Sequence, residues 1–217
     1  MRADIYLFSN EDVFNTARLQ VKLKQSGECL IYEPWDNKCY KSEARGGVLD
    51  LTLDMGNMLF VIFGDEIPKD APPIKNESAR VKCRVPFEMS LLEEGRAEPI
   101  SVAKSSEPFD ITAPDKYPEF SGKIIYEGAF TPVDGFDVID LGQVGDVAEV
   151  YLNGKYLGAR INAPYKFSMK GALTEGENRI RVEVTSGLGH RRRDWLSSFM
   201  QISPTGLLGD IHLCKYI

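Results

Sequence analysis

The stretch AEVYLNGKYLGARINAPYKFSMKGAL, residues 148–173, decides the fold of this chain. Ala148, Val150 and Leu152 alternate with polar or aromatic residues up to Asn153-Gly154, and a second strand-like run follows at once. Asn-Gly is the dipeptide best suited to the positive φ angles of a type I′ turn. The stretch therefore predicts a tight β-hairpin with an architectural role, and function is expected in the loops.

Strand patterns dominate the rest of the chain. Residues 179–185 place Ile180, Val182 and Val184 on one face of a strand with a period of two. Comparable runs occupy residues 4–8, 18–23, 29–35, 48–54, 58–63, 123–130, 136–142 and 209–217. The run MLFVIF, 58–63, is apolar throughout, so we expect a strand covered on both faces. Only EMSLLEE, 88–94, and DWLSSFM, 194–200, are candidates for a short helix.

The chain is long enough for two domains. Its 217 residues allow two hydrophobic cores, and a stretch with Pro68, Pro72, Pro73 and alternating charges suits an exposed connector. We therefore predict a small β-sandwich at residues 1–66, a linker at 67–77 and a larger β-sandwich at 78–217. Five expected strands form only a small hydrophobic core in the first domain. We therefore expect a neighbouring domain to cover part of its apolar surface.

Composition and charge exclude several functions. The hydrophobic fraction of 43% and charged fraction of 27% are those of a soluble globular protein, and no apolar run is long enough to span a bilayer. A formal net charge of -6 and a pI near 5.1 give no general attraction to phosphate backbones. Neither a nucleic acid nor a membrane is expected as a partner.

No metal or other cofactor is expected. The four cysteines, Cys29, Cys39, Cys83 and Cys214, are scattered without a CxxC pair, and the chain has only His190 and His212 to complete a metal site.

The opening residues MRADIYLFSN enter a strand pattern at once, without the features of an export signal. We expect a piece of a longer polypeptide, which is cytoplasmic or exported. A short cytoplasmic protein is the alternative.

The loop at 186–206 is the main candidate for binding. It gathers Arg191, Arg192, Arg193 and Trp195, and an indole face beside guanidinium groups suits a sugar ring and its hydroxyl or carboxylate groups. Asn162 and Tyr165, just past the hairpin, form a second polar and aromatic group. The alternative is that Trp195 anchors the loop, that the arginines are a solvated turn, and that Asn162 and Tyr165 are ordinary turn residues.

Catalytic motifs are absent. The sequence has no G-x-S-x-G, P-loop or H-E-x-x-H motif, and its 32 acidic residues form no recognisable glycosidase pair. A histidine-based site would have to use His190, which has no evident nucleophile nearby in the sequence, or His212, which alternates with apolar residues in the last strand. No catalytic residue is assigned.

Four segments in the second half resemble a known family. They are FSGKIIYEGAF, 120–130; DLGQVGDVAEVYLNGKYLGARINAPYKFSMKGAL, 140–173; GENRIRVEVTS, 176–186; and TGLLGDIHL, 205–213. In this order they resemble the galactose-binding-like jelly-roll domain of glycoside hydrolase family 2. They are more similar to the carboxy-terminal part of α-L-rhamnosidase-type glycoside hydrolases of family 106.

The first 64 residues resemble the small β-sandwich that follows the catalytic barrel in such enzymes, through DIYLFSN and EPWDNKCY. The chain departs from the family at Ile161-Asn162-Ala163, where aromatic residues are common, and at Arg192-Arg193, where an Asn-Arg motif is common.

The resemblance implies two all-β domains, a small β-sandwich and a jelly roll, that serve as non-catalytic modules of a glycoside hydrolase acting on plant or host glycans. Carbohydrate and the parent's catalytic barrel are the expected partners. Two alternatives remain open: both domains only brace the barrel, or the chain is a self-sufficient β-sandwich hydrolase or lyase.

Overall fold

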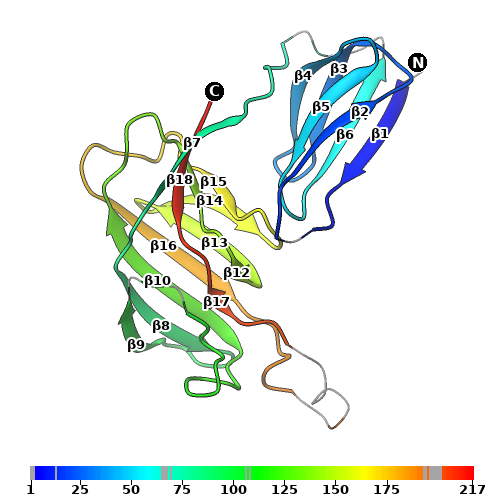
Figure 1. The fold of residues 1–217 in the computed structure, drawn as a ribbon. Coiled ribbons are helices and arrows are strands. Elements are labelled where there is room, and N and C mark those ends of the chain that lie inside the picture. The colour runs from blue at the N-terminus through cyan, green and yellow to red at the C-terminus, as the bar shows by residue number, and fades with distance from the viewer. Residues whose placement is uncertain are drawn as a thin grey trace. The chain divides into compact units, whose positions relative to one another are not determined.

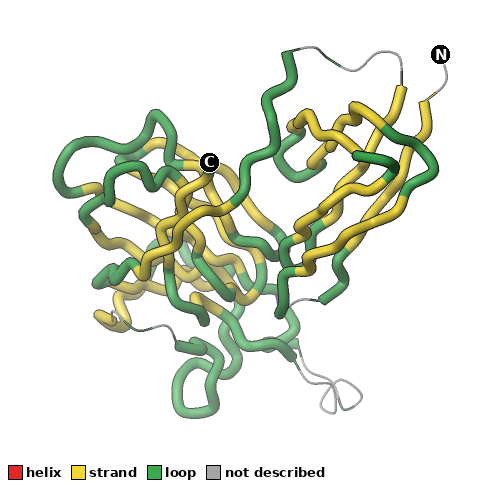
Figure 2. The backbone as a smooth tube through the Cα atoms, turned by 45° about the horizontal axis from the view of Figure 1, so that its top comes forward, coloured by secondary structure: helices red, strands yellow, loops and turns green. Residues whose placement is uncertain are grey.

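The computed structural model describes residues 3–12, 14–64, 68, 70–105, 107, 109–192, 195 and 202–217. These residues form antiparallel sheets and no helix (Figure 2). The chain divides into two compact units, Met1–Asn76 and Glu77–Ile217, each with its own hydrophobic core. The all-β sandwich class predicted from the sequence is confirmed.

The first unit is a small sandwich of two sheets (Figure 1). Its strands are β1 (Ala3–Ser9), β2 (Ala17–Lys22), β3 (Gly27–Glu33), β4 (Lys38–Ala44), β5 (Val48–Leu53) and β6 (Met58–Gly64). One sheet has the order β1-β6-β3-β4, and β2 pairs with β5 in the other. Alternate residues of β5 (Leu49, Leu51 and Leu53) pack with Ile31 and Val61 of the larger sheet in one core.

Two expectations for this unit were wrong. Strand β4 was not predicted, because its side chains are nearly all partly exposed and show no alternation of apolar and polar residues. The run 58–63 was expected to be covered on both faces. Instead, Leu59, Val61 and Phe63 are buried, while Met58 is 39% exposed and the other side chains of its face are only partly covered.

The proline-containing segment between the units belongs partly to the first sheet. The amide of Lys41 donates a hydrogen bond to the carbonyl oxygen of Pro72 across 2.8 Å, and the amide of Ile74 donates to the carbonyl oxygen of Lys41 across 3.4 Å. The side chain of Ile74 packs against the core of the first unit. These contacts attach the segment to the edge of β4.

The second unit is a larger sandwich. Its long strands are β7 (Glu77–Lys82), β8 (Phe87–Glu93), β9 (Ile100–Ser105), β10 (Gly122–Phe130), β13 (Val147–Leu152), β14 (Lys155–Arg160), β16 (Asn178–Thr185) and β18 (His212–Tyr216). The short ones are β11 (Val138–Asp140), β12 (Val144–Gly145), β15 (Lys166–Ser168) and β17 (Gly206–Leu207).

Two sheets of this unit face each other across one core. The six-stranded sheet has the order β14-β13-β16-β10-β8-β9, and the four-stranded sheet has the order β15-β11-β18-β7. Val150 and Val182 from the first sheet belong to the same cluster of buried residues as Ile139, Phe167 and Leu213 from the second. The shared core joins the sheets face to face.

The predicted hairpin at 148–160 is confirmed. Strands β13 and β14 pair antiparallel, and both Asn153 (φ 51°) and Gly154 (φ 79°) have the positive φ angles of a type I′ turn. Ala148, Val150 and Leu152 are completely buried, as the alternation predicted.

The helix expected at 88–94 was wrong. This segment lies in β8, where Phe87, Met89 and Leu91 are buried with a period of two and the backbone pairs with β9 and β10. Pairing on both sides decides its conformation, which local sequence does not reveal. The helix expected at 194–200 lies outside the described residues apart from Trp195. In the described part of the chain, no helix is long and apolar enough to cross a membrane.

Candidate functional site

Several loops leave one end of the six-stranded sheet together. Arg160, the last residue of β14, lies opposite Ala148, and Thr185, the last residue of β16, lies opposite Val147. The strands on either side of β13, β14 and β16, therefore end at the same edge of the sheet. The segments that follow them carry Asn162 and the Arg191–Trp195 loop, so the two groups predicted from the sequence emerge from one end of the second unit.

A buried polar cluster holds the base of the longer loop. His190 is 8% exposed, and its Nε2 donates a hydrogen bond to the carbonyl oxygen of Ser203 across 3.1 Å. The hydroxyl of Thr205, which is completely buried, lies 3.5 Å from the same nitrogen and donates to Oδ2 of Asp146 across 3.3 Å. His190 thus links the two ends of the loop.

Asp110 completes this cluster. Its Oδ1 accepts hydrogen bonds from the amides of Thr112 (2.8 Å) and Thr205 (3.1 Å). Burial would raise the pKa of this carboxyl, but a hydrogen bond from the Thr112 hydroxyl (2.7 Å), the two amide bonds and the nearby His190 together lower it below its usual value. The carboxylate therefore stays ionised and ties the segment before β10 to the end of the loop.

The predicted site residues have different environments. The amides of Arg191 and Arg192 donate to the carbonyl oxygen of Leu188 in a turn, and both residues are exposed. Trp195 is 77% exposed, and Asn162 is also exposed. Arg193 lies outside the described residues. Asn162, Arg191, Arg192 and Trp195 are called the rim surface below.

Tyr165 lies in the core and not on the rim surface. It is 6% exposed, and its hydroxyl donates a hydrogen bond to the carbonyl oxygen of Asp146 across 2.7 Å. Burial and the nearby Asp146 raise the pKa of Tyr165 to about 12. Its hydroxyl supports the turn before β13, and little of its ring is accessible to a ligand.

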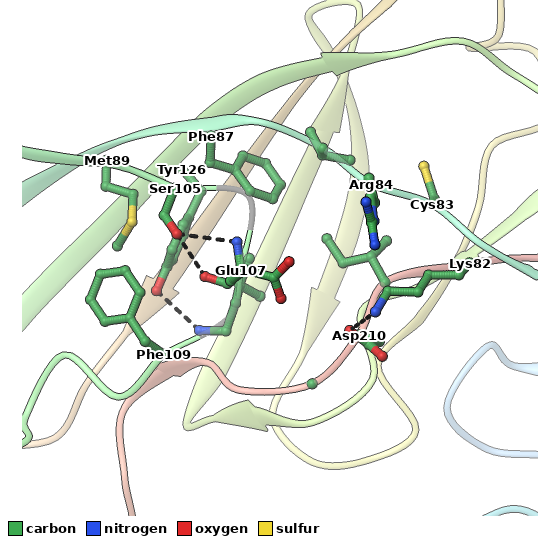
Figure 3. A pocket seen from close by; sticks show the side chains of 14 residues that line it. Lys82, Cys83, Arg84, Phe87, Met89, Ser105, Glu107, Phe109, Tyr126 and Asp210 are labelled. Carbon is green, nitrogen blue, oxygen red and sulfur yellow. Dashed lines mark hydrogen bonds and ion pairs between the residues drawn. The ribbon is translucent and has the colours of Figure 1, made fainter.

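Sequence reasoning missed a pocket on the second unit (Figure 3). It is a partly open hollow and not an enclosed cavity. Its apolar lining comes from Val85, Phe87, Met89, Tyr126, Leu207 and Ile211. Four separate segments of the chain line this pocket, so no local sequence motif predicts it.

The mouth of this pocket is charged. Lys82 pairs with Asp210 across 2.7 Å near Arg84, and Glu107 lies across the pocket next to Ser105 (Figure 3). Inside, the hydroxyl of Tyr126 accepts a hydrogen bond from the amide of Leu207 at 3.0 Å. A largely apolar lining with the hydroxyls of Tyr126 and Ser105 suits a small apolar group better than a sugar, whose hydroxyls need several polar partners.

The described residues contain no group of three histidine, cysteine or acidic side chains arranged to hold a metal ion.

The fold and the rim surface define a protein of two antiparallel β-sandwich units with an exposed aromatic and basic loop. No family model matches the chain. It is similar to the structure of a rhamnosidase from Novosphingobium sp. PP1Y, with a TM-score of 0.67 and 21% identity over 96% of this chain. It spans 22% of that enzyme's chain. The resemblance to a rhamnosidase-type glycoside hydrolase is thus confirmed at the level of the fold.

Two further similarities are weaker. A GH2 beta-galacturonidase from Eisenbergiella tayi, bound to galacturonate, matches 65% of this chain and 25% of its own, with 17% identity and a TM-score of 0.48. A curated protein from Formosa agariphila, named as a candidate beta-glucuronidase, is 42% identical over 48 residues. That match covers 22% of this chain and 4% of the Formosa protein.

Proposed function

We propose that this chain is a non-catalytic module of a glycoside hydrolase and that it contacts carbohydrate through the rim surface. The fold shared with a rhamnosidase supports the enzyme class. The observation that carries the binding role is the 77% exposure of Trp195, on a loop whose base is fixed by buried hydrogen bonds. Tryptophan and arginine are enriched in protein binding surfaces, so an exposed indole beside two arginines is a candidate contact for a ligand.

The chemistry of the rim surface suits a saccharide. The indole of Trp195 offers a flat apolar face for the C–H groups of a pyranose ring. The guanidinium groups of Arg191 and Arg192 offer forked donors for hydroxyl or carboxylate oxygens, and the amide of Asn162 both donates and accepts. These residues project from the end of the sheet, so we expect shallow and weak binding.

The test is a calorimetric titration of the protein with rhamnose-containing and uronate-containing oligosaccharides. Trp195→Ala should weaken binding at least about tenfold, without changing the melting temperature. The matched control is Phe14→Ala, which removes an aromatic side chain that is 75% exposed on the first unit. Equal affinities of the wild type and Trp195→Ala would remove the rim surface from consideration.

A bracing role is the second candidate, and one face of the first unit favours it. The outward positions of β1 are Ala3, Ile5, Leu7 and Ser9. Those of β6, opposite them, are Met58, Phe60, Ile62 and Gly64. None of these residues is charged. Ile5 is 60% and Leu7 57% exposed. An uncharged sheet face of this kind is typical of a surface that packs against another domain, here the catalytic barrel.

This candidate has its own test. The Ile5→Lys, Leu7→Lys double variant is made in the chain alone and in a polypeptide that joins a rhamnosidase-type barrel to it. Bracing predicts that the double variant lowers the melting temperature of the joined polypeptide but not that of the chain alone. The expected decrease is several degrees, which corresponds to a loss of about 1–2 kcal/mol in the free energy of unfolding. An equally small change in melting temperature in the chain alone and in the joined polypeptide would eliminate the bracing role.

A further inference from the structure

A pair of tyrosines lies on the outward face of the six-stranded sheet, away from the rim surface loops. Ala148, Val150 and Leu152 of β13 point into the core, so Glu149 and Tyr151 point outward. Tyr151 lies opposite Tyr156 of β14, with ring centroids 5.1 Å apart and planes at 45°. Tyr156 is 50% exposed. The two rings form an aromatic platform at the β14 edge of the sheet.

A row of charged side chains continues from this platform across the sheet. Tyr151 lies opposite Arg181 of β16, which lies opposite Glu127 of β10. The three strands β13, β16 and β10 are neighbours in the sheet (Figure 1). Arg181 pairs with Glu183 (2.6 Å) and with Glu127 (3.4 Å). Adjacent strands are about 4.8 Å apart, so Tyr156 to Glu127 spans roughly 14 Å. This length accommodates more than one sugar ring.

Lys123 extends the network to the carboxylate beside the tyrosines. Its Nζ lies 2.5 Å from Oε2 of Glu183 and 3.5 Å from Oε2 of Glu149. Glu183 is only 6% exposed and is held by two cations. The side chain of Glu149 is 28% exposed and that of Arg181 is 44% exposed, so both keep bonding capacity for a ligand. The network fixes the positions of these polar groups in advance of binding.

The balance of groups selects the class of ligand. Three carboxylates (Glu127, Glu149 and Glu183) lie among three cations (Lys123, Arg179 and Arg181), so the face has no net charge to attract an ionic ligand. A protein partner would need a wider apolar core than two rings surrounded by charges. A neutral sugar has both a C–H face for the rings and hydroxyls that donate to carboxylate and accept from guanidinium.

We propose that this face is a second carbohydrate surface, on which a neutral pyranose stacks on Tyr156 beside Tyr151 and bonds through its hydroxyls to Glu149 and Arg181. The inference shares with the proposed function only the class of ligand. It depends on none of the rim surface residues.

The experiment titrates the protein with neutral hexasaccharides of glucose, xylose or galactose and compares five proteins: wild type, Tyr156→Ala, Tyr156→Phe, Glu149→Gln and Trp195→Ala. Tyr156→Ala should weaken binding at least about tenfold, while Tyr156→Phe keeps the stacking ring and most of the affinity. Glu149→Gln should weaken binding less, because an amide still bonds to hydroxyls. A thermal melt of each variant checks that it is folded.

The outcomes separate the two surfaces. Loss of binding in Tyr156→Ala but not in Trp195→Ala supports the sheet face and argues against the rim surface. Loss in Trp195→Ala with unchanged Tyr156→Ala overturns this inference and leaves the proposed function standing. If Tyr156→Ala does not fold, weaker binding by Glu149→Gln than by the wild type supports the inference, and unchanged binding by Glu149→Gln overturns it. A wild type that binds no neutral sugar overturns the inference, while uronate binding still tests the rim surface.

Discussion

The side-chain amide of Asn153 donates a hydrogen bond across 2.7 Å to Oδ1 of Asn178, which is completely buried. The same Asn178 oxygen accepts from the amide of Thr174 at 2.9 Å, and its Nδ2 donates to the carbonyl oxygens of Thr174 and Gly176. The type I′ turn of the β13–β14 hairpin is therefore bonded to the start of β16 through one buried amide. Asn153 serves both as a residue that tolerates positive φ and as a bridge to the next strand.

The first prediction concerns this buried amide. Asn178→Ala should lower the free energy of unfolding by about 2–3 kcal/mol, because several polar groups lose their partner without gaining water. Urea denaturation followed by circular dichroism measures the change. Asn162→Ala, at an exposed asparagine of the same unit, is the control and should change stability by less than about 0.5 kcal/mol. Equal effects of the two substitutions would contradict the role of Asn178.

A second prediction concerns stability in acid. Glu77 of β7 bonds to Nε of Arg80 at 2.8 Å and lies 3.4 Å from Nζ of Lys166. Burial would raise the pKa of Glu77, but the bond from Arg80 and the charge of Lys166 outweigh it and lower the pKa to about 2, from an ordinary value of 4.5. A carboxyl whose pKa is lowered by folding stabilises the folded state above its unfolded pKa.

Stability should therefore fall as the pH drops from about 4.5 toward about 2. Glu77→Gln should be less stable at neutral pH and should lose less stability over this range. Melting temperatures recorded at closely spaced pH values provide the measurement. Glu98→Gln, at an exposed glutamate on the same unit, should retain the wild-type slope. A Glu77→Gln profile parallel to that of the wild type would show that the Arg80 pair is not the cause.

The third prediction concerns the thiols. All four cysteines are free; Cys29 and Cys214 are completely buried, while Cys39 and Cys83 are partly exposed. Burial raises the pKa of Cys214 to about 12 and that of Cys83 to about 11, which removes the reactive thiolate. A thiol-specific chromogenic reagent at mildly alkaline pH should label Cys39 first, and Cys29 and Cys214 only after denaturation. Rapid labelling of all four in the native protein would mean that the sandwiches open readily.

Sequence patterns identified most central strands but fewer of the edge strands. In β16, Ile180, Val182 and Val184 are buried as the period of two predicted, because both neighbouring strands and the opposite sheet cover that face. Edge strands such as β4 and β9 are partly exposed on both faces, so their sequences show no alternation. Strand β8 was mistaken for a helix because Leu92 interrupts the alternation of Met89 and Leu91, whereas pairing with β9 and β10 on its two sides decides its conformation.

The candidate surfaces were only partly predictable. Trp195, Arg191 and Asn162 were singled out by residue type and loop position, and all three are exposed. Nothing local distinguished Tyr165, which is buried, from an exposed loop aromatic. His190 was considered for catalysis, whereas its ring bonds to a backbone carbonyl. The tyrosine pair and the pocket had no sequence signal, since each depends on strand register or on several segments meeting.

By itself, the sequence determined the class of fold and the hairpin at its centre, because the alternation of apolar residues and the Asn-Gly turn act over a few neighbouring positions. The tertiary structure alone decided which aromatic rings are buried, which loops share one end of the sheet and which charges meet on its face. Those outcomes depend on contacts between residues distant in the chain, and such contacts exist only after the sheets have paired and packed.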